Sequence, residues 1–127
     1  MQKTISDWLS PVPLLAILRE ITPHEVDEVG DVLIELGYRI LEVPLNSPDP
    51  YQSIQQLAKR YSGSALIGAG TVLKPEQVPQ VADAGGTLIV SPNLNPEVVK
   101  ATKRMGMISV PGVFTPTEAF QALDAGA

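Results

Sequence analysis

The chain has 127 residues, of which 44% are hydrophobic and 18% are charged, a composition typical of one globular domain. Its net charge of −5, without any run of Lys and Arg, argues against a nucleic-acid partner. With no cysteine and one histidine, the sequence excludes disulfides and thiolate metal sites, and we expect no metal or other cofactor.

The N-terminal segment is predicted to form a short amphipathic helix, because Ile5, Trp8 and Leu9 recur at helical spacing. Residues 1–10 have neither the basic start nor the apolar centre of a signal peptide. No apolar run approaches the roughly 20 residues needed to span a bilayer. We therefore expect a cytoplasmic protein with no membrane partner.

Five short apolar runs follow, and we predict that each forms a strand: residues 12–18, 39–45, 65–69, 87–90 and 108–110. Almost every residue in these runs is apolar, which is typical of parallel strands covered on both faces.

Five amphipathic segments lie between and after these runs, each opened by a proline and closed by a glycine: residues 23–37, 50–63, 75–85, 96–106 and 116–126. Proline is tolerated at the first helical position, and glycine accepts the left-handed conformation that ends a helix. Residues able to cap a helix precede four of the prolines, with Lys74 the exception: Thr22, Asp49, Asn95 and Thr115. Glu25 and Glu118 complete two predicted capping boxes with Thr22 and Thr115. In the helix predicted within residues 23–37 we expect one apolar face, formed by Val26, Val29, Leu33 and Leu36.

The alternation of strands and helices predicts right-handed βαβ units in a single α/β domain, residues 1–127. Two architectures fit: a doubly wound open sheet, or part of a (β/α)8 barrel. No glycine-rich nucleotide-binding motif follows the first strand, which weakens the nucleotide-binding versions of both. In either architecture, ligands bind at the carboxyl ends of the strands.

Glu42 is the most suggestive residue at those ends, because it interrupts the apolar run Ile40–Leu45. Burial there would raise the pKa of the carboxyl toward neutrality and suit a proton shuttle. A structural pairing of Glu42 with Arg19 or Arg39 is the alternative.

Several other residues follow strands on the same rim. Arg19 could hold a carboxylate or phosphate, or be a solvated strand end. The run Gly68–Thr71 would let a ligand approach the backbone closely, or simply form a turn. Asn46 and Pro92 belong to polar loops that could equally serve as turns, and Lys74 is the one lysine on this rim.

The order of these motifs resembles the KDPG/KHG aldolase family over essentially the whole chain. The motifs that carry the resemblance are residues 16–19, 41–48, 67–73, 91–93 and 110–119. It implies a class I aldolase on a (β/α)8 barrel, usually a homotrimer. Such an enzyme cleaves a phosphorylated 2-keto-3-deoxy sugar acid to pyruvate and glyceraldehyde 3-phosphate through a lysine imine, without a metal.

The resemblance also assigns roles to individual residues. It implies that Glu42 is the general acid/base, that Arg19 binds the pyruvyl carboxylate, and that Thr71 and Pro92 line the same pocket. Asn46 lies in a Pro-Leu-Asn-Ser-Pro version of its motif, which favours a galactonate-derived substrate over the gluconate epimer.

The family's imine lysine lies on a sixth strand, which these five βα units do not contain. We therefore expect the five units to be part of a longer protein and to be inactive alone. Two other functions stay open: a non-catalytic half-barrel for assembly or ligand binding, and an open-sheet phosphate-binding domain.

Overall fold

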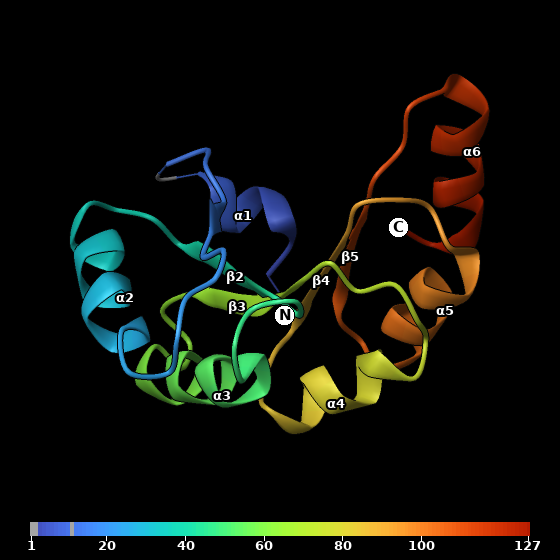
Figure 1. Cartoon of the computed structure of the whole chain (residues 1–127). Coiled ribbons are helices and arrows are strands. Elements are labelled where there is room, and N and C mark those ends of the chain that lie inside the picture. Colours follow the sequence, from blue (N-terminus) through green and yellow to red (C-terminus); the bar gives the residue numbers. More distant parts are fainter. Residues whose placement is uncertain (1–2, 11) are drawn as a thin grey trace.

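The computed structural model describes residues 3–10 and 12–127. Five parallel strands form one sheet in sequence order: β1 (Ala16–Ile17), β2 (Ile40–Pro44), β3 (Leu66–Gly70), β4 (Leu88–Ser91) and β5 (Ile108–Pro111). The helices are α1 (Ile5–Leu9), α2 (Val26–Glu35), α3 (Pro50–Arg60), α4 (Gln77–Asp83), α5 (Pro96–Arg104) and α6 (Pro116–Ala125). Helices α2 to α6 follow one another around the outside of a curved sheet (Figure 1). Each crossover helix thus lies on the same side, so the doubly wound alternative is wrong and a partial barrel is confirmed.

The predicted helix ends are confirmed by the backbone. The glycines at positions 37, 63, 85, 106 and 126 all have positive φ, between 70° and 103°. Helices α3, α5 and α6 begin at the predicted prolines, whereas α2 and α4 begin one turn or less after theirs, at Val26 and Gln77.

Two of the four predicted caps form as expected. Asn95 accepts a hydrogen bond from the backbone N–H of Glu97, and Thr115 forms a full capping box with Glu118. Asp49 occupies the N-cap position of α3 in a left-handed conformation, with a φ of 45°, but its side chain makes no capping hydrogen bond, so the predicted cap is wrong. At Thr22 only half of the box forms: the Thr22 N–H donates to the Glu25 carboxylate, whereas the Glu25 N–H donates to the Thr22 carbonyl and not to its hydroxyl.

The first strand is much shorter than predicted. Pro13 supplies no backbone donor, and β1 has only one neighbouring strand, so ladder pairing is confined to Ala16 and Ile17. Leu14 and Ile17 are consequently half-exposed.

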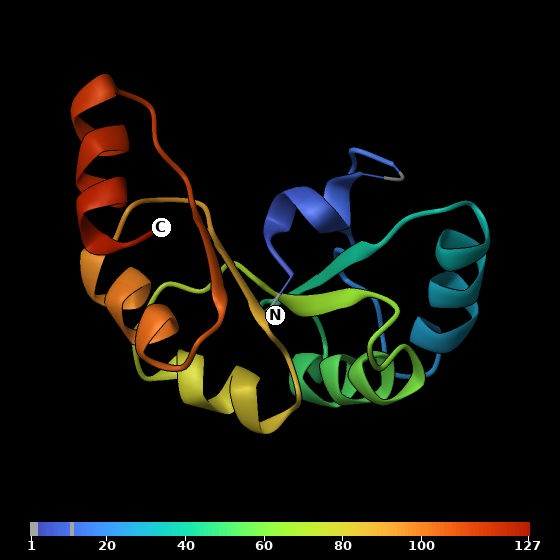
Figure 2. The same ribbon diagram turned by 180° about the vertical axis from the view of Figure 1, so that it is seen from behind.

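The sheet has a core on each face. The outer core packs the strands against helices and includes Val26, Leu41, Ile54 and Ile67. The inner core consists of Ile40, Leu66 and Leu88, and it is covered by Ile5, Trp8 and Leu9 of α1. Figure 2 shows α1 on the inner side of the arc, opposite the other helices. Both faces of the central strands are therefore covered, as their apolar sequences predict.

The predicted apolar face of α2 is only partly correct. Val26 is buried and Leu33 packs against the core, but Val29 and Leu36 are 37% and 66% exposed. Gly30 faces inward instead, where an added Cβ would lie 2.8 Å from the Tyr61 hydroxyl. This close approach of α3 turns the helix away from the orientation that apolar spacing alone indicates.

The two edge strands, β1 and β5, are each paired on one side only. Large apolar side chains are exposed near both edges: Leu14, Ile17, Val32 and Leu36 at one, and Phe114, Phe120 and Leu123 at the other. Among the described residues, no helix is long and apolar enough to cross a membrane.

Candidate active site

Glu42 lies in the middle of β2 with its side chain on the inner face of the sheet. Residues on a strand alternate between faces, so Glu42 shares the face of Ile40, which belongs to the inner core. The residue is only 3% exposed. Among the described residues its Oε2 atom has no hydrogen-bond partner. A buried carboxylate oxygen without a partner is costly, and such groups concentrate where a protein uses them.

Gly70 makes room for this carboxylate. Gly70 pairs with Pro44 across the β2–β3 ladder, and an added Cβ would overlap the carboxylate of Glu42. At Gly68 an added Cβ would instead overlap the backbone oxygen of Leu88. The two glycines therefore make room for a side chain and for a neighbouring strand, and close approach of a ligand to this run stays a prediction.

The pKa of Glu42 is raised from 4.5 to about 7, because burial disfavours the charged carboxylate. The positive charge of Arg19 acts in the opposite direction and lowers this pKa. Arg39 takes no part, because its guanidinium donates to the backbone oxygens of Ile34 at 3.0 Å and Tyr38 at 2.6 Å. Glu42 is therefore near its own midpoint at neutral pH, as a group that both accepts and donates protons should be.

Arg19 directly follows the first strand pair. The N–H of Leu18 donates to the carbonyl of Glu42 at 2.9 Å, which places the next residue beside the carboxyl half of β2. Arg19 is exposed, and it forms no ion pair within the part of the chain described. A guanidinium in this position is available to an anionic ligand that approaches Glu42.

Thr71 follows Gly70 and has a φ of 55°, in the left-handed region that β-branched residues rarely adopt. The surrounding loop is fixed to β4. The N–H of Val72 donates to the carbonyl of Val90 at 3.2 Å, and the Ser91 hydroxyl donates to the Val72 carbonyl at 2.7 Å. Non-glycine residues in this conformation persist only where their surroundings hold them, and they cluster at functional sites.

Asn46 and Pro92 lie on the same rim but make no hydrogen bond with Glu42. Asn46 is exposed in a turn closed by a 2.9 Å bond from the Ser47 N–H to the Pro44 carbonyl. Pro92 is exposed and its carbonyl packs so closely on Gly112 that an added Cβ there would overlap it. The structure thus brings Glu42, Arg19 and the Gly70–Thr71 corner together, whereas Asn46 and Pro92 are exposed residues without a hydrogen bond to Glu42.

The polar loops predicted on this rim hold two hydroxyls whose burial the sequence did not indicate. Ser47 and Ser91 are each 6% exposed, and each hydrogen-bonds to the loop after the preceding strand. A serine at or shortly after the carboxyl end of a strand was the available signal, but the same residue type is common in simple turns.

The lysines of the chain lie away from Glu42 or point to solvent. All are exposed, and only Lys74 follows the carboxyl end of a strand: Lys3, Lys59, Lys74, Lys100 and Lys103. In residues 3–10 and 12–127 there is no group of three or more His, Asp or Glu side chains that could hold a metal ion.

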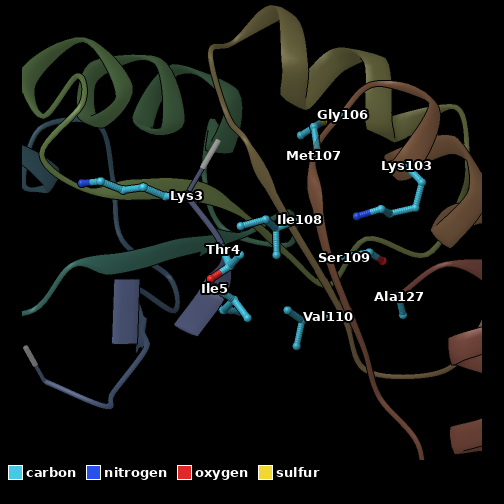
Figure 3. A pocket seen from close by; sticks show the side chains of 10 residues that line it. All are labelled: Lys3, Thr4, Ile5, Lys103, Gly106, Met107, Ile108, Ser109, Val110 and Ala127. Atoms are coloured by element: carbon cyan, nitrogen blue, oxygen red, sulfur yellow. The ribbon is translucent and has the colours of Figure 1, made fainter. Parts of the chain in front are cut away.

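A separate cavity of about 340 Å³ lies beside the amino end of β5 (Figure 3). Its lining includes Ile5, Lys103, Met107 and Val110, and no Asp or Glu side chain. It borders the unpaired edge of β5 and contains none of the rim residues, so it is not part of the candidate active site.

Comparison with known proteins identifies relatives of the whole chain. The model of the family described as KDPG and KHG aldolase matches residues 5–127. A probable 2-dehydro-3-deoxy-6-phosphogalactonate aldolase of Rhizobium meliloti is 52% identical, with 91% of this chain and 54% of that protein covered. The 2-dehydro-3-deoxy-6-phosphogalactonate aldolase of Escherichia coli is 50% identical, with 94% and 58% covered.

A solved structure described as native KDPGal superposes with a TM-score of 0.89 at 51% identity, over 91% of this chain and 56% of that one. The chain therefore spans little more than half the length of these relatives. The matching family model, the shared sequence and the shared partial-barrel fold agree. The chain belongs to the KDPG and KHG aldolase family.

Proposed function

We propose that this chain supplies the proton-transfer part of a class I aldolase active site. The reaction is the cleavage of 2-dehydro-3-deoxy-6-phosphogalactonate to pyruvate and D-glyceraldehyde 3-phosphate. The observation that carries the proposal is the buried carboxyl of Glu42. Its Oε2 atom has no hydrogen-bond partner among the described residues, its pKa is about 7, and the charge of Arg19 acts on it. The names of the two relatives at 50–52% identity support the galactonate substrate over its gluconate epimer.

In this mechanism Glu42 accepts and returns protons while a lysine holds the substrate as an imine. The imine accepts the electron pair released when the carbon–carbon bond breaks. Glu42 takes the proton of the C4 hydroxyl as the C3–C4 bond breaks, and it then gives that proton to the enamine carbon to form the methyl group of pyruvate. Water hydrolyses the resulting imine, which releases pyruvate and regenerates the lysine. We assign Arg19 to the carboxylate of the pyruvyl part, and Thr71, Pro92 and Asn46 to the walls of the pocket.

The imine lysine must come from outside these five βα units, because each lysine of the chain is exposed and four do not lie on the rim. We propose that residues 1–127 act as one domain that contributes five units to a complete barrel, and that the enzyme is a cytoplasmic homo-oligomer.

Borohydride reduction in the presence of pyruvate tests the proposal. Mass spectrometry should find no pyruvyl adduct on the 127-residue chain alone. A polypeptide that also contains the lysine-bearing remainder of the barrel should be labelled irreversibly, because borohydride traps the imine. A labelled lysine within the five units would contradict the assignment of the nucleophile.

Exchange of the pyruvate methyl protons tests the role of Glu42. It is measured without borohydride, on the longer polypeptide that pyruvate is expected to label. Glu42→Gln should abolish nearly all exchange while leaving the fold intact, because the amide cannot transfer the proton. Glu76→Gln, on an exposed residue beside α4, is the matched control and should exchange at the parent rate. Parent-rate exchange in Glu42→Gln would remove Glu42 from the mechanism.

The second candidate is a non-catalytic half-barrel that binds a ligand or assembles with another chain. The absence of any lysine beside Glu42 within the described residues favours it. It predicts that no form of the protein is labelled by pyruvate and borohydride.

A further inference from the structure

A single side-chain hydrogen bond joins the loops that follow β1 and β2. The N–H of Glu20 donates to the Ser47 hydroxyl oxygen at 3.1 Å. Ser47 is 6% exposed, although its neighbours Asn46 and Pro48 are exposed. The bond therefore links the residue after Arg19 to a point fixed in the rim.

Arg19 has few other restraints on that side. Glu20 has a φ of 60°, a left-handed conformation that is unfavourable for a residue other than glycine. The strand before it, β1, has only two residues and a single neighbour. The remaining backbone bond in this turn, from the Ile21 N–H to the Leu18 carbonyl, is long at 3.4 Å. The conformation that aims Arg19 thus depends on an acceptor for the Glu20 N–H.

The hydroxyl of Ser47 bonds to the loop after β1, and it is not needed to close the turn after β2 in which Ser47 lies. The turn that contains Asn46 is closed by backbone atoms, from the Ser47 N–H to the Pro44 carbonyl. Replacing the hydroxyl with hydrogen leaves that turn closed, but it leaves the part-buried Glu20 N–H without its acceptor.

We propose that Ser47 is a positioning residue, which acts through Arg19 by holding Glu20 in its left-handed conformation. The inference rests on the proposed function, because Arg19 matters only if an anionic substrate binds at this rim. It adds a residue that touches no substrate but fixes the distance between the guanidinium and Glu42.

The first test concerns the hydrogen bond itself and needs no activity. Amide hydrogen exchange of Glu20, followed by NMR in the 127-residue chain, should be accelerated by Ser47→Ala and not by Ser47→Thr, which keeps the hydroxyl. Ser53→Ala is the matched control, since Ser53 is fully buried in α3 and its hydroxyl has no partner among the described residues. Unchanged exchange in Ser47→Ala would overturn the proposal.

The second test measures the steady-state kinetics of the longer polypeptide, which contains the lysine-bearing remainder of the barrel and is labelled by pyruvate and borohydride. Ser47→Ala should raise KM about tenfold and change kcat less than about twofold, as expected when one binding contact is misplaced. Ser47→Thr should restore the parent KM, and Ser53→Ala should not change it. In an Arg19→Ala background, Ser47→Ala should have no further effect, because both changes remove the same interaction.

The outcomes separate the two proposals. An active protein in which Ser47→Ala has the parent KM, or in which its effect adds fully to that of Arg19→Ala, overturns the positioning role alone. Failure of Ser47→Thr to restore KM has the same consequence. If no form is labelled by pyruvate, the proposed function fails and the positioning role fails with it.

Discussion

Two opposing influences set the proton affinity of Glu42. Burial raises its pKa to about 7, and the charge of Arg19 limits that rise. The carboxylate must be desolvated to hold a proton at neutral pH, yet it must still ionise to accept one. The cost of this compromise is a dependence of stability on pH, which can be measured.

We predict that the free energy of unfolding falls as the pH rises from 4.5 to 7. Because the pKa of Glu42 is raised from 4.5 to about 7 on folding, the folded state binds more protons than the unfolded chain within this window. The loss approaches about 3 kcal/mol and is complete above pH 7. Urea unfolding at pH 5 and pH 8 measures it.

The variant Glu42→Gln isolates this contribution from other groups. Carboxyls such as Asp31, whose pKa is lowered to about 2 by hydrogen bonds from Arg60 and Tyr61, change stability in the opposite direction at lower pH. The difference between parent and Glu42→Gln should therefore change between pH 5 and pH 8, whereas Glu76→Gln should parallel the parent. A constant difference would show that Glu42 titrates normally.

The sequence was informative at this scale only where a residue broke a local pattern. Glu42 could be predicted because a carboxylate within an apolar strand is conspicuous. The reason for Gly70 and the role proposed for Ser47 could not, because both depend on partners in another βα unit. Gly70 pairs with Pro44 in the β2–β3 register, which leaves room for the carboxylate of Glu42, and Ser47 reaches Glu20 across 27 residues.

At the scale of helices and strands, local chemistry explains most boundaries. The five glycines ended their helices because each adopts a positive φ that other residues disfavour. The predicted faces and caps depended on tertiary contacts and were less reliable. Tyr61 drew Gly30 of α2 inward, and the left-handed Asp49 forms no cap despite a suitable side chain.

The two kinds of predicted cap should respond differently to substitution. Asn95→Ala should lower the free energy of unfolding by about 1 kcal/mol, because it removes the bond to the Glu97 N–H and a 3.3 Å bond to the Leu73 carbonyl. Asp49→Gly should cause no loss, because glycine adopts a φ of 45° readily and no capping bond is removed. Urea denaturation of both variants measures the contrast, and equal losses would contradict it.

On the scale of the whole molecule, the sheet is curved but has two unpaired edges with apolar side chains beside them. The family resemblance predicted this partial barrel, because the motifs are collinear with a complete one. Composition and periodicity alone left the open sheet as an equal alternative. What decides between them is the strand order β1-β2-β3-β4-β5, which amphipathic patterns do not encode.

We predict that the 127-residue chain associates with itself as its concentration rises. Unpaired strand edges and exposed apolar side chains both favour such contacts. Phe114 is 99% exposed, so Phe114→Ser should weaken association without changing the free energy of unfolding. Sedimentation velocity over a concentration series measures this, with Thr117→Ala, an exposed position on the neighbouring α6, as the control. A parent chain that sediments as a monomer throughout would contradict the prediction.

The pairing of every strand with its neighbour in sequence has a consequence for synthesis on the ribosome. Within the described residues, every strand pairs with the strand before or after it in sequence. Each βα unit can therefore dock on the preceding unit as it leaves the ribosome. Arg19 follows β1, and Glu42 and Gly70 lie in β2 and β3, so the three residues meet through consecutive strand pairings. The part of the rim to which we assign proton transfer can therefore assemble while the ribosome is still translating the fourth and fifth units.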